Sequence, residues 1–225
     1  MTEDEQKQAA AAKAVDYIEE GMVIGLGTGS TAAKMVDLVG ARVKAGLKIT
    51  GVPTSEATAN QARNLGIPVV GLDEVEEIDL TIDGTDEVDP EGRLIKGGGG
   101  AHLREKIVAS LSKKMIVIAE AKKRVAKLGA FKLPVEVIRF AAPALKSRLD
   151  ALGCTAALRL TKDGTPFVTD EGNYIYDCDF KVIKDPEGIA LTLSTLPGVV
   201  EHGLFIGYPD IVIIGTDSGV DVTEY

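Results

Sequence analysis

Short apolar runs alternate regularly with helix-like segments over the first half of the chain, and this alternation limits the possible folds more than any other feature. Runs of a few residues rich in Val, Ile and Leu are typical of buried strands, whereas apolar residues three and four positions apart indicate a helix. The run at 22–26, for example, precedes apolar residues at helical spacing from Ala32 to Val43. Repeated strand–helix–strand order predicts a parallel sheet with helices on both faces. We expect strands at 22–26, 48–52, 67–72, 78–82 and 115–119, and helices near the N-terminus, from about 31, at 55–65 and at 103–111. Ser55 is expected to cap the helix at 55–65.

The pattern changes after the Leu133-Pro134 dipeptide, where shorter apolar runs are separated by turn signals at 162–164 and 171–173. The order of elements becomes β-α-β-β-α-β, which is that of a ferredoxin-like unit. We expect its strands at 135–140, 155–160, 174–180 and 199–205, and its helices at 143–152 and 186–196.

These patterns predict an α/β protein in which a Rossmann-like parallel-sheet domain carries an inserted, smaller, ferredoxin-like α+β domain. The fully apolar run at 211–214 suits a last strand of the first sheet. The larger domain is therefore expected to be discontinuous, at 1–130 and 206–225, and the smaller one to span 131–205.

The charge of the chain limits its partners. Lysine and arginine number 25 and aspartate and glutamate 34, which gives a net charge of −9 at pH 7. Nucleic acids and anionic membranes bind basic surfaces, so neither is expected as a partner. The polar residues 1–8 differ from a signal peptide, and no apolar run approaches the ~20 residues that span a bilayer. With two cysteines outside any Cys-x-x-Cys pair, the sequence predicts a cytoplasmic protein with reduced thiols.

The loop at 25–31 joins a predicted strand to a predicted helix and is rich in glycine. Glycines let a ligand approach the backbone, and a helix N-terminus offers free N–H groups with a partial positive charge. The hydroxyls of Thr28, Ser30 and Thr31 add donors, so the loop has the chemistry of a phosphate site. A Walker loop is excluded, and a dinucleotide loop fits only loosely, with Glu56 as the one candidate for its acidic ribose partner. A glycine-rich turn without a ligand is the alternative.

The acidic loop at 83–89 directly follows another predicted strand. Loops at the carboxyl ends of parallel strands are where such folds bind ligands. Asp83 and Asp86 are candidates for hydrogen bonds to sugar hydroxyls or for moving a proton between oxygens. A calcium loop would need glycine at its sixth position, which Val88 occupies. A solvated acidic turn is the alternative.

The segment 96–106 begins with Lys96 and four consecutive glycines. Such a run loses much entropy on ordering, so it is expected where several backbone amides surround a ligand. The helix that follows carries an apolar stripe from Leu103 to Leu111, and Glu105 lies about 200° of helical rotation from Leu103. Glu105 therefore faces either solvent, paired with a basic neighbour, or the ligand.

Together the three loops supply phosphate donors, carboxylates, a lysine and a group of amides at predicted strand ends. The sequence has no redox-cofactor motif, no metal-ligand cluster and no evident nucleophile–histidine pair. Proton transfer on a phosphorylated small molecule needs only the groups that are present.

The tracts at 27–32, 83–87, 96–99 with 104–106, 133–137 and 197–205 resemble, in order and spacing, motifs of the A-type ribose-5-phosphate isomerase family. They correspond to its phosphate loop, its DG-[AT]-DE motif, its KGGG…REK motif and patterns around its small domain. The resemblance covers essentially the whole chain, and Gly100 departs from it because many members have Ala there. It implies reversible isomerisation of D-ribose 5-phosphate and D-ribulose 5-phosphate in the non-oxidative pentose phosphate pathway. It also implies no cofactor and no metal, a homodimer or dimer of dimers, and a small domain that acts as lid and interface.

The resemblance, combined with residue chemistry, also implies roles. Glu105 is expected to be the general base that moves a proton from C2 to C1 through a cis-enediolate. Asp83 would assist ring opening, Lys96 would hold the sugar oxygens, and Lys7 and Lys123 would add positive charge near the phosphate. The expected catalytic residues are Glu105, Asp83 and Lys96. The expected substrate-binding residues are Thr28, Gly29, Ser30, Thr31, Asp83, Gly84, Thr85, Asp86, Lys96, Gly97, Gly98, Gly99, Lys123 and Lys7.

The roles of two residues remain open. Lys7 could instead be a solvated lysine on the surface of its helix, and His102 could either contact substrate or serve in capping or packing. Other functions also remain open. A non-catalytic sugar-phosphate-sensing module would usually carry a DNA-binding segment, and none is evident. Glucosamine-phosphate deaminases and CoA transferases look distantly similar in fold. A CoA transferase would use a glutamate as nucleophile, so an acyl-CoA would trap it covalently. A nicotinamide enzyme would be detected by titration with its cofactor.

Overall fold

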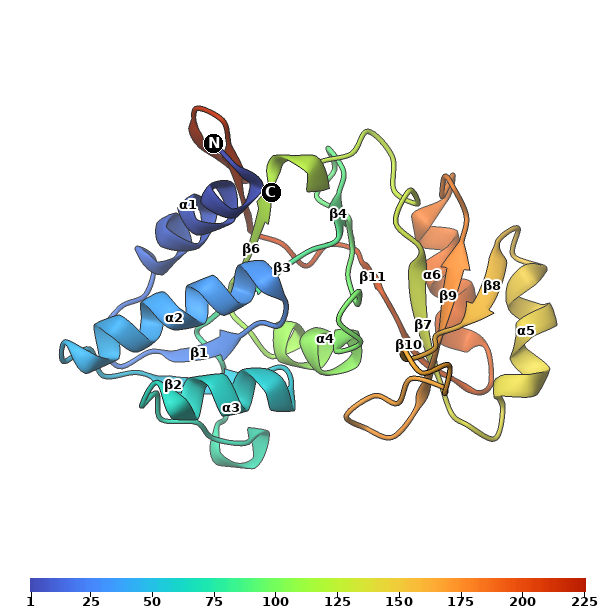
Figure 1. Ribbon diagram of the computed structural model, residues 1–225, viewed down its shortest axis with the longest axis horizontal. Helices are drawn as coiled ribbons and strands as arrows, with labels where there is room; N and C mark the ends of the chain where they lie inside the picture. Colours follow the sequence, from blue (N-terminus) through green and yellow to red (C-terminus); the bar gives the residue numbers. More distant parts are fainter. The chain divides into compact units, whose positions relative to one another are not determined.

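The computed structural model describes all 225 residues, and they form two compact units (Figure 1). The larger unit comprises Met1–Thr85, Arg104–Arg124 and Gly207–Tyr225, and the smaller comprises Asp86–Leu103 and Val125–Ile206. Compared with the expected division, the segments 86–103 and 125–130 and the residue Ile206 pack with the smaller unit. The reason is a hairpin within 86–103 that pairs with a strand at Leu204–Phe205.

The larger unit contains a six-stranded sheet in the order β13-β12-β6-β3-β1-β2. Its strands are β1 (Val23–Leu26), β2 (Thr50–Pro53), β3 (Leu80–Gly84), β6 (Met115–Glu120), β12 (Ile211–Thr216) and β13 (Gly219–Glu224). Its helices are α1 (Glu3–Val15), α2 (Ser30–Lys44), α3 (Glu56–Asn64) and α4 (His102–Ser110, whose first two residues belong to the smaller unit), with short 3-10 turns η1 (Leu72–Glu74) and η2 (Ala121–Lys123). All six residues of β6 are buried, as expected for a parallel strand covered on both faces.

Local signals explain where these helices begin. Thr2 and Glu5 form a capping box at the start of α1. The side chain of Ser55 accepts a hydrogen bond from the Thr58 N–H and caps α3, which confirms its predicted role. Apolar residues of α1 and α2, including Met35, form one buried cluster with apolar residues of the strands β1, β3, β6 and β12. This cluster fixes the helices against the sheet from which the loops emerge.

Two expectations for this sheet were wrong. The predicted strand at 67–72 forms only a single bridge, between Val69 and Gly51, before the chain enters η1. Pro68 lies within this segment and has no N–H to extend a ladder. The sheet is also mixed rather than wholly parallel, because β13 pairs antiparallel with β12. The mostly exposed β13 lacks the apolar run that marks the other strands.

The smaller unit contains an antiparallel four-stranded sheet in the order β10-β7-β9-β8. Its elements are β7 (Leu133–Val137), α5 (Ala142–Asp150), β8 (Thr155–Leu158), β9 (Tyr174–Asp179), α6 (Pro186–Thr195) and β10 (Val199–His202). The element order is therefore the predicted β-α-β-β-α-β. A three-stranded sheet in the order β11-β5-β4 accompanies it, formed by β4 (Glu87–Val88), β5 (Leu94–Ile95) and β11 (Leu204–Phe205).

The single strand predicted at 199–205 is thus two strands, β10 and β11, which belong to different sheets. Gly203 lies between them, and its N–H donates to the Pro134 carbonyl. A side chain at this position would overlap the carbonyl oxygen of Lys96. The glycine therefore allows the chain to pass close to Lys96 as it changes sheet.

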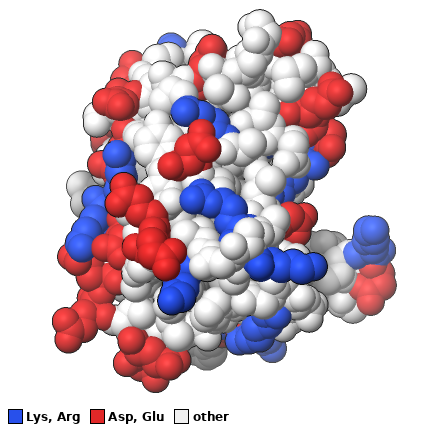
Figure 2. Space-filling view, turned by 90° about the vertical axis from the view of Figure 1, so that its left-hand side faces the viewer, with Lys and Arg blue, Asp and Glu red and all other residues white.

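Helix length and surface charge both bear on which partners the protein can have. None of the helices combines the length and the apolar composition that crossing a membrane requires. On the face shown in Figure 2, acidic and basic side chains are interspersed in small groups, without a broad basic area. This face does not offer the extended positive surface that nucleic acids bind.

Candidate active site

The candidate site of the larger unit lies at the carboxyl ends of β1, β3 and β6, which are neighbours in the sheet. The chain leaves β1 toward β2 on one side of it and returns to form β3 on the other side of β1. The direction in which strands are added to the sheet therefore reverses between β1 and β3. Such a reversal creates the crevice in which open α/β sheets bind ligands. A Cβ added at Gly84 would lie 3.8 Å from the Thr28 carbonyl oxygen and 3.9 Å from that of Ile118. The expected phosphate loop and acidic loop are therefore adjacent.

Asp83 is fully buried and is held by two backbone donors. Its Oδ1 accepts the N–H of Thr28 at 3.0 Å and the N–H of Gly84 at 2.7 Å. Gly27 lies directly against it, because a Cβ there would be 2.5 Å from the Asp83 Cα. The two loops thus fix this carboxylate, which excludes a solvated acidic turn at this position.

Thr28 connects the phosphate loop to the start of α3. Its Oγ1 lies 2.7 Å from Thr54 Oγ1, 2.8 Å from Ser55 Oγ and 3.1 Å from Thr58 Oγ1. Since its N–H also donates to Asp83, both donors of Thr28 are used within the chain. Its hydroxyl and amide hold the loop in shape.

The N-terminus of α2 has the properties of an anion site. Gly29 precedes the helix with a φ of 112°, and no side chain caps the helix. The first turn contains no acidic residue, so the positive end of the helix dipole is not balanced from within α2. Ser30 is exposed at this end and Thr31 is 7% exposed. The backbone amides here suit a phosphate.

Glu56, the only candidate for an acidic ribose partner, is paired elsewhere. Its Oε1 accepts a hydrogen bond from Arg104 Nη1 at 2.9 Å, and this bond lowers the pKa of the glutamate. The dinucleotide alternative therefore loses its one acidic residue to an ion pair with α4.

Lys7 and Lys123 lie at the end of β6. Gln6 Oε1 accepts the Ala121 N–H at 3.2 Å, which joins α1 to η2. Lys7 Nζ is 2.9 Å from Glu3 Oε1 and 3.9 Å from Glu120 Oε1, and its side chain is 15% exposed. The side chain of Lys7 is therefore mostly buried and paired, which argues against the alternative that it is a solvated lysine on the helix surface.

Glu105 lies on the buried side of α4 and is 4% exposed. Val108, one turn later, packs on β1, since its Cγ1 is 2.8 Å from where a Cβ at Gly25 would lie. The expected apolar stripe is instead at the surface, with Ile107 40% and Leu111 44% exposed. A solvent-facing Glu105 was therefore the wrong alternative, and the helix buries its carboxylate on the side that packs against the sheet.

The glycine loop of the smaller unit is a tight turn. Gly97 and Gly100 have φ values of 105° and 79°, which side chains rarely adopt. The Gly100 N–H donates to the Gly97 carbonyl at 2.9 Å, and the Gly98 N–H donates to Asp86 Oδ2 at 2.7 Å. Alanine at 100 would be strained here, because its Cβ would also lie 2.6 Å from Phe167. The departure at Gly100 is therefore required by this backbone.

Lys96 and His102 flank this loop, and both are buried. Lys96 is 2% exposed, and its Nζ lies 5.4 Å from the centre of the Phe205 ring. His102 is fully buried, with Nε2 3.9 Å from Glu136 Oε2, and its Nδ1 is 2.8 Å from where a Cβ at Gly97 would lie. The position of His102 favours packing against the loop over contact with substrate.

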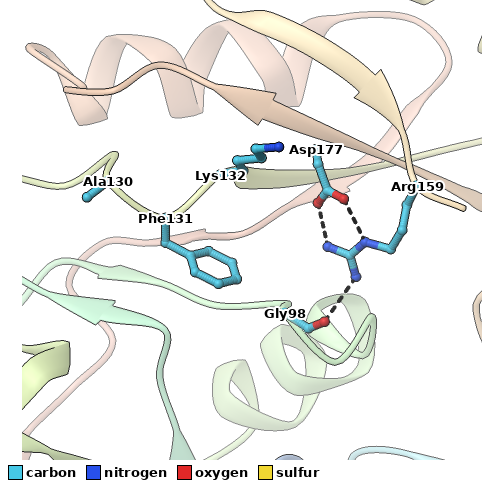
Figure 3. Close-up of a pocket in the computed structure, with 6 residues that line it drawn as sticks. All are labelled: Gly98, Ala130, Phe131, Lys132, Arg159 and Asp177. Carbon is cyan, nitrogen blue, oxygen red and sulfur yellow. Dashed lines mark hydrogen bonds and ion pairs between the residues drawn. The ribbon is translucent and has the colours of Figure 1, made fainter. Parts of the chain in front are cut away.

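Sequence analysis missed Arg159, which contacts the glycine loop, and Asp177, which pairs with Arg159 (Figure 3). Arg159 donates to the carbonyls of Gly97 and Gly98 and forms an ion pair with Asp177. No local motif marks either residue, because only the pairing of β8 with β9 brings them together. The cavity beside them has a volume of about 380 Å³ and is lined by Gly98, Ala130, Phe131, Lys132, Arg159 and Asp177.

The structure divides the expected site between its two units. The larger unit holds Lys7, Thr28, Gly29, Ser30, Thr31, Asp83, Gly84, Thr85, Glu105 and Lys123, and the smaller holds Asp86, Lys96, Gly97, Gly98 and Gly99.

Comparison with known proteins agrees on one family. The family model described as ribose 5-phosphate isomerase A (phosphoriboisomerase A) matches residues 50–219. A protein named ribose-5-phosphate isomerase A from Parvibaculum lavamentivorans is 52% identical, with both chains covered in full. One of the same name from Roseiflexus sp. is 50% identical over 98% of this chain and 96% of its own.

Solved structures give the same result over the whole fold. A D-ribose-5-phosphate isomerase in complex with phospho-erythronic acid superposes with a TM-score of 0.98 at 42% identity, with both chains covered in full. The ribose 5-phosphate isomerase A of Methanocaldococcus jannaschii superposes with a TM-score of 0.95 at 39% identity, again over both full chains. The chain described here belongs to the ribose 5-phosphate isomerase A family.

Proposed function

We propose that this chain interconverts D-ribose 5-phosphate and D-ribulose 5-phosphate in the pentose phosphate pathway. Family membership supports the reaction. The structural observation that carries the site is the buried Asp83 carboxylate, held by the phosphate loop beside the uncapped start of α2. An anion site next to a fixed carboxylate suits a sugar that carries a phosphate at one end and reacts at the other.

The phosphate binds at the N-terminus of α2. The amides of Gly29, Ser30 and Thr31 and the hydroxyls of the last two donate to its oxygens, as helix N-termini commonly do. Thr28 keeps the loop in shape through its own hydrogen bonds. Lys7 and Lys123 add positive charge at the end of β6. The remaining sugar contacts come from Gly84, Thr85, Asp86, Lys96, Gly97, Gly98 and Gly99.

The chemistry begins when Asp83 accepts the proton of the anomeric hydroxyl while Lys96 holds the sugar oxygens. The bond from C1 to the ring oxygen breaks, the C1 aldehyde forms, and the ring oxygen takes up the proton to become a hydroxyl. Glu105 then removes the proton from C2, which leaves a cis-enediolate, and returns it to C1 to form the ketose. Burial of Glu105 keeps water from competing for this proton. The hydroxyl proton of O2 passes to O1 in the same sequence. One proton thus moves between adjacent carbons and one between their oxygens, and the overall composition and oxidation level of the sugar are unchanged.

The developing oxyanion is stabilised by Lys96 and by backbone amides of the glycine loop. Two amides of that loop are already occupied, because Gly98 donates to Asp86 and Gly100 to Gly97. Gly97 and Gly99 therefore supply the donors. Fixed donors of this type are typically worth ~3–4 kcal/mol each.

The ligand class has support from a relative. The isomerase described with phospho-erythronic acid binds a phosphorylated acid whose planar carboxylate resembles a cis-enediolate in shape and charge. We propose that this chain binds the same compound and that it mimics the intermediate here.

We further propose that the larger sheet is Rossmann-like and the four-stranded unit ferredoxin-like. For function we keep the division into 1–130 with 206–225 and a lid at 131–205, because it groups Lys96 and the glycine loop with the catalytic residues. The protein is proposed to act in the cytoplasm as a homodimer or dimer of dimers with the lid at the interface. Light scattering would measure its oligomeric state.

The function is tested by following D-ribose 5-phosphate turnover through ketose absorbance or circular dichroism, with and without EDTA. Glu105→Gln should lower kcat by ~10²–10⁴, the usual loss for a general base, and should keep binding of phospho-erythronic acid. The matched control is Glu19→Gln, an exposed glutamate of the same unit. Near-normal kcat in Glu105→Gln would remove that residue from its role. A folded wild-type protein that binds the sugar phosphate without turnover would instead indicate non-catalytic sensing.

A further inference from the structure

Arg159 binds the glycine loop from the side of its carbonyl groups. Its Nη1 donates to the Gly97 oxygen at 3.0 Å and to the Gly98 oxygen at 3.2 Å. Its Nε and Nη2 donate to the two carboxylate oxygens of Asp177 at 3.0 and 2.5 Å (Figure 3). Four of the five N–H groups of the guanidinium are thereby used. The side chain is 14% exposed, so this geometry is enclosed by the smaller unit.

These bonds orient the peptide groups of the loop. In a planar trans peptide, the carbonyl of one residue and the N–H of the next point in opposite directions. The peptide between Gly97 and Gly98 is fixed at both ends, since its carbonyl accepts from Arg159 and from the Gly100 N–H and its N–H donates to Asp86. The next peptide directs the Gly98 carbonyl to Arg159, so the N–H of Gly99 points away from the guanidinium. Gly99 is exposed.

We propose that Arg159, held by Asp177, is a positioning residue that directs the Gly99 N–H toward the oxyanion of the reacting sugar. This inference rests on the isomerase function proposed above, and it assigns a task to two residues outside the expected site. Glycines have the widest choice of backbone conformation, so a run of them needs an external clamp to keep one amide in place. The rigid fork of arginine can hold two carbonyls and a carboxylate at once, which the single ammonium of lysine cannot do in the same geometry.

Direct binding of the substrate phosphate by Arg159 fits the contacts less well. Its charge is matched by Asp177 through a bidentate ion pair, and its donors point at protein oxygens. A residue with this arrangement affects the reaction through the loop that it holds. Its loss should therefore change the transition state more than the binding of the substrate.

The test compares Arg159→Ala, Arg159→Lys and Asp177→Asn with the wild type. We expect Arg159→Ala to lower kcat by roughly 10- to 100-fold, somewhat less than outright removal of an oxyanion donor. KM and inhibition by inorganic phosphate should stay near wild type. Affinity for phospho-erythronic acid should fall together with kcat, because its carboxylate occupies the place of the enediolate. Arg159→Lys should recover only part of the activity, and Asp177→Asn should show a milder loss of the same type.

The cavity of about 380 Å³ beside Arg159 allows a rescue experiment. Guanidinium ion, added below denaturing concentrations, should enter the space left in Arg159→Ala and raise its kcat. It should leave Glu105→Gln unchanged. The matched control is Arg139→Ala, which removes an exposed arginine of the same unit that donates to the Gly172 carbonyl at 2.6 Å. This control should keep wild-type kinetics.

The outcomes separate the positioning role from the function itself. A wild-type protein without isomerase activity would overturn the proposed function. An active wild type with Arg159→Ala and Asp177→Asn within twofold of its kcat would overturn the positioning role alone. Loss of kcat that matches the loss of folded protein would also count against it, as would an equal rise in the KM for the sugar phosphate and in the inhibition constant of inorganic phosphate.

Discussion

Gly27→Ala tests whether the packing of the phosphate loop against Asp83 determines the activity. Gly27 directly follows β1 and lies against Asp83, so that a Cβ at Gly27 would be 2.5 Å from the Asp83 Cα. Ordinary contacts of a Cβ begin at 3.4 Å, so the two segments must separate by about 0.9 Å. The Cβ would also overlap Oδ1 and Cγ of Asp83, so it displaces the carboxylate itself, and the Cα behind these atoms is backbone that cannot rotate away.

The size of the effect follows from this displacement. Overpacking of a well-packed interior typically costs 1–3 kcal/mol, and about 1 kcal/mol shifts the Tm of a chain of this size by roughly 2–4 °C. The shift also weakens the hydrogen bond from the Thr28 N–H to Asp83, which is 3.0 Å long before the change. Misplacement of a reacting group by about 1 Å can cost 10²-fold in rate. We expect Gly27→Ala to fold with a Tm lower by roughly 2–12 °C and a kcat lower by about 10²-fold.

The control is Gly40→Ala, the same substitution at another crowded position of the larger unit. A Cβ at Gly40 would lie 2.7 Å from the Cβ of Leu65, between α2 and α3, and no site residue lies in that contact. Thermal unfolding and ketose formation are measured for both variants well below their Tm values. Gly40→Ala should lose stability and keep its kcat. A Gly27→Ala protein that is destabilised but turns over like the control would refute the link between this packing and catalysis.

Two further predictions concern buried carboxylates. Asp83→Asn keeps an oxygen for the Thr28 and Gly84 N–H groups but cannot accept a proton, so kcat on cyclic D-ribose 5-phosphate should fall by ~10²–10⁴ with little change in Tm; an equal loss on a pre-opened substrate analogue would argue against a role in ring opening. Glu136→Gln should alter the pH dependence of stability, because burial raises the pKa of Glu136 although hydrogen bonds from Asn173 and Thr169 oppose the shift. A raised carboxyl pKa means that the folded state binds more protons, so the wild type loses stability as pH rises from the unfolded value near 4.5 to the raised one. Chemical denaturation at several pH values should therefore show Glu136→Gln gaining stability relative to wild type as pH rises, and a constant difference would contradict the shift.

Sequence alone predicts those parts of the structure that depend on residues close together in the sequence. The apolar runs of β1, β6 and β12 and the cap at Ser55 are local signals, and the structure confirms them. The segment 67–72 is also apolar, but a proline limited it to a single bridge, and β13 was missed because its residues are mostly exposed. The two-residue strands β4 and β5 are too short to leave a periodic pattern, and they decide which compact unit contains the glycine loop.

The site follows the same rule, and this explains why its supporting residues were harder to find than its reacting ones. Reacting groups occur in compact tracts, because a loop after a strand must carry its donors within a few positions. The residues that hold those loops come from other elements, as Arg159 holds a loop 61 and 62 positions before it in the chain. Burial of Glu105 likewise depends on the face of α4 that packs on β1, and the apolar stripe of the helix indicated the opposite face. A sequence therefore shows which groups are available for chemistry, whereas the packing of distant segments decides which of them are aligned and kept from water.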